Sequence, residues 1–373
     1  MFFKYKKISK SDIIVFHQHP FNFELKKYVL DDLRLKYSVI DETVFNINPK
    51  IILKSIINLL FHLKTLKSFS DFKVIYFLSY IELHNSRVVI TNIDNSVLFQ
   101  KLWRLQKNIK YFAIQNGNRT KYELSNSNKM HLHNFFCFGK YDIDNFKRYG
   151  HTAEKFIPTG SLKSSIFIDK IKKKSQQKYD ICLVSGWKDF LFDDNLDFSF
   201  QGMKNNFVQI DRFIYDYLKI NNYKTVIAMR YGKEAVEYNY YKDYFGDMVE
   251  LKDRIRPLKG ETYRSYQAMY DSEVIISSCS TAAVEAFGMG KKVLLVDFSE
   301  DNRFANYEDG VWIVKENNYE VFKSKLDYLF NLNSADYKKE TADYANYLME
   351  YDHSIPTYKK IIFTLKNSLN EKS

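Results

Sequence analysis

The stretch Asp271–Phe298 reads DSEVIISSCSTAAVEAFGMGKKVLLVDF and contains the clearest strand–helix–strand pattern of the chain. An apolar run ends near Ser277, small polar residues follow, and a second apolar run begins at Lys292. Between them, Ala282–Met289 consists of helix-favouring residues and is closed by Gly290, a residue that commonly ends helices. The stretch therefore predicts a strand, a short helix and a second strand.

Hydroxyl side chains gather where this helix is expected to begin. Ser278, Ser280 and Thr281 lie beside the free N–H groups of the first turn, and such groups, with the helix dipole, bind phosphates and other anions. Glu285 lies one turn further on, where its carboxylate can accept hydrogen bonds from ribose hydroxyls. Ordinary capping of a helix explains the same residue types equally well, so both interpretations stay open.

The rest of the chain shows the same alternation of short apolar runs and longer amphipathic segments, which is typical of βα units. The expected strands cover residues 12–17, 87–91, 110–114, 135–138, 179–184, 225–229, 274–277 and 292–296. This alternation predicts mainly parallel sheets covered on both faces. The polar, basic segment Lys170–Lys178 separates two strand-rich regions, and we interpret it as a linker.

Ligands of open parallel sheets bind at the carboxyl ends of the strands, and several polar residues are expected there. Arg230 can pair with a phosphate or a sugar carboxylate through two hydrogen bonds, although an ion pair with a nearby acid is an alternative. Gly186 allows a ligand to approach the backbone closely. Ser161 and Lys163 can face a phosphate or a carboxylate. A plain turn explains these last three residues as well.

A second polar cluster follows the expected strand 110–114 in the first half of the chain. Its members are Gln115, Asn116, Gly117 and Arg119. Asn-Gly by itself is a common turn, but a run of polar residues directly after a buried strand favours a binding site.

Transfer of a group to a hydroxyl requires a base or a nucleophile at the cleft. Asp94 is the first candidate and His17 the second, with His19 close by. Asp193 and Asp194 are weaker candidates, because they stand in a segment typical of a surface loop. A helix N-cap is the alternative role for Asp94.

Four segments resemble motifs of the GT-B glycosyltransferases that build bacterial surface carbohydrates, in particular Kdo-transferase-like and poly(glycerol phosphate)-transferase-like enzymes. They are STAAVEAFGMGKKVLLVD (residues 280–297), TVIAMRYGKEAVEYNYYKDYFGD (225–247), FAIQNGNR (112–119) and FIPTGSLK (156–163). The resemblance spans residues 12–298 as spaced motifs. Related Kdo-transferase-type enzymes often carry a His-Pro pair where this chain has Arg230-Tyr231, which leaves the identity of the donor open.

The resemblance implies an α/β fold of two Rossmann-like domains that face each other across a cleft. The expected N-terminal acceptor domain covers residues 1–169, with a C-terminal helix in residues 350–373 packing back on it. The linker covers residues 170–178 and the nucleotide-donor domain residues 179–349. The resemblance places the donor contacts mainly on the second domain, at Ser278, Ser280, Thr281, Glu285 and Arg230.

The implied activity is transfer of a sugar from a nucleotide donor, such as a CMP-activated acidic sugar, to a growing surface polysaccharide. Two alternatives stay open: a polyol phosphotransferase that uses a CDP-linked donor, and a noncatalytic subunit of a polysaccharide assembly complex. No cofactor is expected, since the nucleotide sugar is a substrate. The expected acceptor is a glycan or a lipid-linked glycan.

Composition narrows the partners further. The formal net charge of +11 favours phosphate-rich ligands or an anionic membrane face, and no nucleic-acid-binding motif accompanies it. Three separated cysteines argue against a disulfide framework, and no metal-ligand spacing is present, so we expect a metal-independent enzyme. Neither a signal peptide nor an apolar run of about 18 residues is evident. We expect a cytoplasmic protein, with peripheral contact at the inner face of the membrane.

The segment Pro49–Lys67 (PKIILKSIINLLFHLKTLK) bears on that membrane contact. It has several lysines, many aliphatic residues and no acidic residue. It can lie on an anionic membrane, near a lipid-linked acceptor. Its periodicity favours instead an ordinary helix whose apolar side packs on the core.

Overall fold

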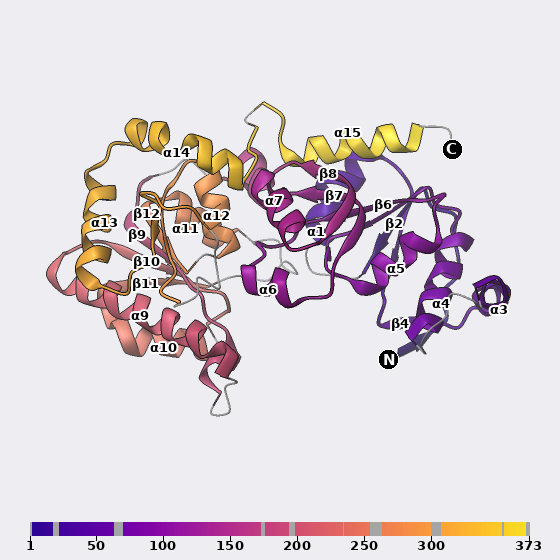
Figure 1. Ribbon diagram of the computed structural model, residues 1–373, viewed down its shortest axis with the longest axis horizontal. Coiled ribbons are helices and arrows are strands. Elements are labelled where there is room, and N and C mark those ends of the chain that lie inside the picture. The colour runs from indigo at the N-terminus through magenta and orange to yellow at the C-terminus, as the bar shows by residue number, and fades with distance from the viewer. Residues whose placement is uncertain are drawn as a thin grey trace.

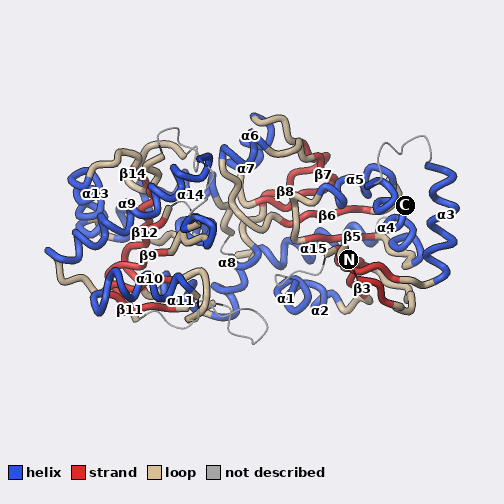
Figure 2. Tube along the Cα trace, turned by 90° about the horizontal axis from the view of Figure 1, so that it is seen from below, coloured by secondary structure: helices blue, strands red, loops and turns tan. Residues whose placement is uncertain are grey.

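The computed structural model describes residues 2–17, 22–62, 70–172, 176–193, 198–233, 235–253, 263–278, 280–299, 307–352 and 354–370 (Figure 1). These residues form two parallel sheets with helices on both sides of each (Figure 2). The α/β fold expected from the alternation of apolar runs is confirmed.

The first sheet has the order β3-β2-β5-β6-β7-β8, and every neighbouring pair is parallel. Its strands are β2 (Ile13–Phe16), β3 (Tyr37–Ile40), β5 (Val88–Thr91), β6 (Lys110–Ile114), β7 (His131–Cys137) and β8 (Thr152–Pro158). The residues of β2 and β5 are fully buried, as expected for strands covered on both faces. A small parallel pair, β1 (Phe2–Lys4) and β4 (Val44–Asn46), lies apart from this sheet.

The second sheet has the order β11-β10-β9-β12-β13-β14 and is also parallel throughout. Its strands are β9 (Tyr179–Val184), β10 (Thr225–Ala228), β11 (Val249–Lys252), β12 (Ser272–Ser277), β13 (Lys292–Val296) and β14 (Ile313–Val314). The eight strands expected from apolar runs are all present, with ends shifted by a few residues. The edge strands β3, β8 and β11 were missed because polar residues interrupt their apolar pattern. The short strands β1, β4 and β14 were also missed, because two or three residues are too few to show a period.

The helices of the first half are α1 (Asn22–Leu25), α2 (Asp31–Leu33), α3 (Pro49–His62), α4 (Ser70–Leu83), α5 (Val97–Leu105), α6 (Lys121–Asn126), α7 (Lys140–Arg148) and α8 (Leu162–Ile166). Those of the second half are α9 (Phe198–Ile220), α10 (Val236–Phe245), α11 (Arg264–Tyr270), α12 (Thr281–Gly288), α13 (Tyr319–Asn331) and α14 (Ser334–Leu348). Short π-helical turns cover Lys26–Leu30 and Phe167–Ile171. Part of the segment interpreted as a linker, residues 173–175, lies outside the described residues.

The chain crosses back to the first half after α14, and the last helix, α15 (Thr357–Asn370), lies there in contact with α2, α8 and β5 (Figure 1). Gly160 shows how close this crossing is. Its φ is +79°, and a Cβ there would lie 2.2 Å from the Glu350 carbonyl oxygen of the crossing segment. The absence of a side chain at Gly160 therefore allows the crossing segment to pack against this turn. Thr357 stabilises the same turn, because its hydroxyl donates a hydrogen bond to the Thr159 carbonyl (2.5 Å).

Candidate functional site

A cavity of about 400 Å³ lies between the two halves of the molecule. The first half contributes the loop after β6, the start of α6 and Lys163, and the second half contributes the loops after β9, β10 and β12 and the start of α12. The polar lining residues include Asn116, Asn118, Thr120, Glu123, Lys163, Ser185, Gly186, Lys188, Arg230, Ser265, Tyr266, Ser278, Ser280, Thr281 and Glu285. The carboxyl ends of both parallel sheets thus meet at one cavity, as the strand-edge rule predicts.

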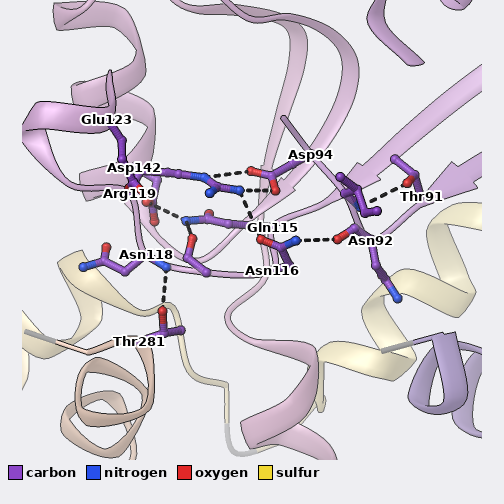
Figure 3. Close-up of polar contacts among 12 residues, drawn as sticks. Thr91, Asn92, Asp94, Gln115, Asn116, Asn118, Arg119, Glu123, Asp142 and Thr281 are labelled. Atoms are coloured by element: carbon purple, nitrogen blue, oxygen red, sulfur yellow. Dashed lines mark hydrogen bonds and ion pairs between the residues drawn. The ribbon is translucent and has the colours of Figure 1, made fainter. Parts of the chain in front are cut away.

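The loop after β6 reaches across to the start of α12 (Figure 3). The backbone N–H of Asn118 donates to Thr281 Oγ1 at 2.9 Å, and the Asn118 side chain hydrogen-bonds to Tyr307. A Cβ at Gly117 would meet the same Thr281 oxygen at 3.5 Å. Two clusters 160 residues apart in the sequence therefore form the two walls of one site.

The start of α12 is capped as its sequence suggests. Ser280 is the N-cap, and its hydroxyl accepts a hydrogen bond from Ala283 N at 3.2 Å. Ser278 lines the cavity in front of this turn. A Cβ on Gly186 would lie 2.6 Å from the Ser278 hydroxyl, so a side chain at this position would require that hydroxyl to turn away. This cap is compatible with the predicted anion site, because the hydroxyl satisfies one N–H group and leaves the helix dipole unchanged.

Three cations face the cavity: Lys163, Lys188 and Arg230. Arg230 is anchored by its guanidinium, which donates to the Trp187 carbonyl at 3.3 Å, and by its backbone N–H, which donates to Glu237 at 2.9 Å. Burial, and after it the charge of Arg230, lowers the pKa of Lys188. Two like charges side by side in a partly buried cavity favour an anionic ligand. Lys188 was missed in the sequence, because nothing in SGWKD resembles a phosphate motif.

Glu285 is buried and lines the cavity, but it has protein partners. Its carboxylate accepts hydrogen bonds from the Ser161 hydroxyl and from the Tyr266 hydroxyl, the latter at 2.5 Å. Ser161 also caps α8. The expected contact of Glu285 with ribose hydroxyls stays a prediction, and the structure adds a second function, which is to join α8 of the first half to α12 of the second.

Arg119 and Asp94 form an ion pair behind the cavity wall (Figure 3). The Asp94 side chain is fully buried, and both of its oxygens accept hydrogen bonds from the Arg119 guanidinium. The same guanidinium donates to Asn116 Oδ1 at 3.1 Å. Burial alone would lower the pKa of Arg119, but the Asp94 carboxylate raises it. The pair therefore holds the loop after β6, and Asp94 does not line the cavity.

Gln115 extends this network to a buried acid. It donates to Asp142 Oδ1 at 2.8 Å and to the Gly117 carbonyl at 3.1 Å. Burial raises the pKa of Asp142 to about 7, although the Gln115 and Gly139 hydrogen bonds act in the opposite direction. Gln115 thus connects Asp142 of α7 to the loop after β6, which reaches across the cavity.

His17 is buried at the end of β2, away from the residues that line the cavity. Its Nδ1 lies 2.8 Å from Thr91 Oγ1, and its Nε2 lies 3.0 Å from Ser96 Oγ and 3.3 Å from Glu42. The hydrogen bond between His17 and the Glu42 carboxylate lowers the pKa of Glu42. Ser96, rather than Asp94, is the N-cap of α5.

The weaker candidates are placed only in part. Asp193 is exposed, whereas His19 and Asp194 lie outside the described residues. Among the residues that the structure describes, no three His, Cys, Asp or Glu side chains gather where they could hold a metal ion. No described helix is both long enough and apolar enough to cross a bilayer.

Comparison with known proteins identifies the family. Residues 112–367 match the model of a family described as "putative O-antigen biosynthesis protein". The chain belongs to this O-antigen biosynthesis family. The matched range includes both walls of the cavity and most of α15. Among curated proteins, none matches the chain in sequence.

Solved structures similar to this chain share its fold at low sequence identity. A glycosyltransferase from Rickettsia africae ESF-5 matches with a TM-score of 0.51 at 13% identity, over 99% of this chain and 100% of that one. A variant of the wall teichoic acid polymerase TagF matches with a TM-score of 0.53 at 10% identity, over 96% and 89%. MnaA of S. aureus with UDP matches with a TM-score of 0.50 at 14% identity, over 97% and 98%. The two-domain GT-B fold is thus confirmed.

Proposed function

We propose that this protein is a glycosyltransferase that moves a sugar from a nucleotide donor to a growing surface polysaccharide. The observation that carries the proposal is the cavity between the two halves, where the start of α12 and the cations Lys188 and Arg230 face the loop after β6. Membership of the O-antigen biosynthesis family supports a surface glycan as the product.

The donor phosphates fit the wall of the second half. The N–H groups at the start of α12 and the hydroxyls of Ser278 and Thr281 favour phosphate oxygens. Lys188 and Arg230 then stabilise the negative charge that grows on the departing nucleotide, as a metal ion does in other transferases. This arrangement supports a metal-independent reaction.

The acceptor fits the wall of the first half, formed by Asn116, Asn118 and Thr120. Transfer requires a base within hydrogen-bond reach of the acceptor hydroxyl. Glu123 lines the cavity from α6, whereas Asp94 is buried in its ion pair with Arg119. We therefore propose Glu123 as the base and assign Asp94 a positioning role.

A polyol phosphotransferase is the second candidate, because TagF shares the fold and has been soaked with CDPG. The cations of the cavity suit both a nucleotide sugar and a CDP-linked polyol, since each of these donors carries phosphates next to the bond that breaks. A third outcome, epimerisation of a nucleotide sugar, follows from the same fold in a UDP-GlcNAc 2-epimerase from Methanocaldococcus jannaschii. The reaction products separate these three activities.

The first experiment measures the melting temperature of the purified protein with CMP, CDP, UMP, UDP, GDP and ADP, with and without EDTA. A ligand that binds only the folded state raises the melting temperature. A shift with one nucleotide that EDTA leaves unchanged supports the metal-independent donor site. CMP points to an acidic sugar and CDP to a polyol phosphate. No shift with any nucleotide in the millimolar range would contradict the proposal and favour a noncatalytic subunit.

The second experiment tests the base. Nucleotide release from the matching donor is followed against pH for the wild type, Glu123→Gln and Asp94→Asn. The proposal expects Glu123→Gln to lose about 10²–10⁴-fold in kcat together with the acidic limb of the pH profile. It expects Asp94→Asn to keep that limb. The reverse result would restore Asp94 as the base.

A further inference from the structure

Helix α3 packs on the protein with its polar side. Asn58 is buried, and its side chain donates to Ser79 Oγ at 2.9 Å and to Glu82 at 2.8 Å on α4. Lys54 pairs with the same Glu82 at 3.1 Å. Apart from Asn58, Ile51 is the buried residue of α3. The expectation that the apolar side of this helix packs on the core is therefore wrong for the described part of the segment.

The apolar side of α3 faces solvent. Leu53 is 62% exposed, Leu60 66% and Phe61 80%. The other large exposed residues of the helix, at the same three- and four-residue spacing, are Ile52, Ile56 and Ile57. A continuous stripe of this kind differs from the single exposed apolar residues of ordinary surfaces and marks an interaction site.

Two further exposed aromatic residues lie on the strand that pairs with β4. Strand β1 exposes Phe2 and Phe3, and it pairs with β4, the strand just before α3. Both views place α3 at the outer end of the first half, on the side away from the second half (Figures 1 and 2).

The sequence on either side of the stripe is basic. No acidic residue occurs between Thr43 and Ser70, and lysines stand at positions 50, 54, 64 and 67. The residues before the first acid of the chain, Asp12, add Lys4, Lys6, Lys7 and Lys10. Apolar side chains with a cationic surround match the interface of an anionic bilayer. A second copy of the chain would instead bring like charges together.

We propose that the α3 surface, formed by Ile52, Leu53, Ile56, Ile57, Leu60 and Phe61, binds peripherally to an anionic lipid bilayer, with α3 lying in the plane of the interface. The proposal goes beyond the transfer reaction and does not depend on it. The catalytic cleft stays outside the bilayer, and the surface holds the protein where a lipid-linked glycan is presented.

Flotation of the full chain with vesicles tests the proposal. Vesicles of phosphatidylcholine are compared with vesicles that also contain about 30 mol% phosphatidylglycerol. The protein is expected to float with the anionic vesicles and to be released by salt. Leu53→Asp with Leu60→Asp is expected to weaken this binding by at least about a hundredfold, since each leucine loses its burial. Lys4→Gln with Lys7→Gln is expected to weaken it by about tenfold.

A matched control carries the same two added charges elsewhere. Val236→Asp with Phe363→Asp replaces residues that are 68% and 66% exposed, and it is expected to bind vesicles like the wild type. Melting temperatures and nucleotide binding of both double variants show that the fold is intact. Failure of the wild type to bind anionic vesicles overturns the proposal. So does a dimer, measured by light scattering without lipid, that Leu53→Asp with Leu60→Asp converts to a monomer.

Discussion

Replacement of Lys188 by glutamine separates ligand binding from stability. In the unliganded protein, Lys188 lies near Arg230 in a partly buried cavity, and burial together with that neighbour lowers its pKa. Removal of one of two like charges should leave the melting temperature unchanged or raise it slightly. Binding of a nucleotide should weaken, because one charge-assisted contact to phosphate is lost. The substitution thus has opposite effects on the free and the bound protein.

The size of the effect follows from ordinary values. A hydrogen bond to a charged group contributes about 1.5–3 kcal/mol, or about 10–150-fold in Kd. A nucleotide at 100 times its Kd stabilises the wild type by about 2.7 kcal/mol, whereas a hundredfold weaker Kd leaves about 0.4 kcal/mol. The difference corresponds to a melting-temperature shift of roughly 3 °C or more.

Differential scanning fluorimetry with the best nucleotide of the panel, followed by calorimetric titration, measures both quantities. Lys219→Gln is the matched control, because it removes an exposed lysine at the end of α9, away from the cavity lining. If Lys188→Gln binds the nucleotide as tightly as the wild type and Lys219→Gln do, the phosphates lie elsewhere and the assignment of the cations is refuted.

Three further predictions concern stability. Gly160→Ala should lower the free energy of unfolding by about 2 kcal/mol or more, because it combines a left-handed φ with a steric clash. Gly246→Ala is the control, since Gly246 also has a positive φ but lies in open space, and it should cost about 1 kcal/mol. Urea denaturation of the two variants compares these costs. Asp142 keeps its proton up to about pH 7 in the native state because burial raises its pKa, whereas an unfolded Asp loses its proton near pH 4. This group therefore makes the free energy of unfolding fall as the pH rises from about 4 to about 7. Denaturation of Asp142→Asn at several pH values should show a flatter dependence of stability on pH. Asp94→Asn should cost about 3–5 kcal/mol by leaving the largely buried Arg119 without its carboxylate partner, and adding Arg119→Gln should recover part of that loss in a double-mutant cycle.

Local sequence predicted the elements of the site well. The capped start of α12 at Ser280 and the polar loop after β6 follow from residue types whose preferences act over a few neighbours. Their meeting was also foreseeable, since the carboxyl ends of parallel strands face a shared edge. The GT-B resemblance named the same segments.

Other assignments needed the structure because they depend on which residue lies opposite. Asp94 has the composition of a catalytic acid, but its partner Arg119 comes from another strand end, and their ion pair removes it from the cavity lining. Lys188 follows a strand without any motif, and it becomes important only beside Arg230 and the cleft.

The sequence by itself determined the α/β class, the order of the eight predicted strands and the capped start of α12, because these features follow from periodicity and from contacts within a few residues. Only the tertiary structure decided which residues share the cleft and which side of α3 faces outward. A helical pattern shows that two faces differ, but not which one packs. Glu82, on the neighbouring helix, binds Asn58 and Lys54, and it thereby turns the apolar face of α3 to solvent.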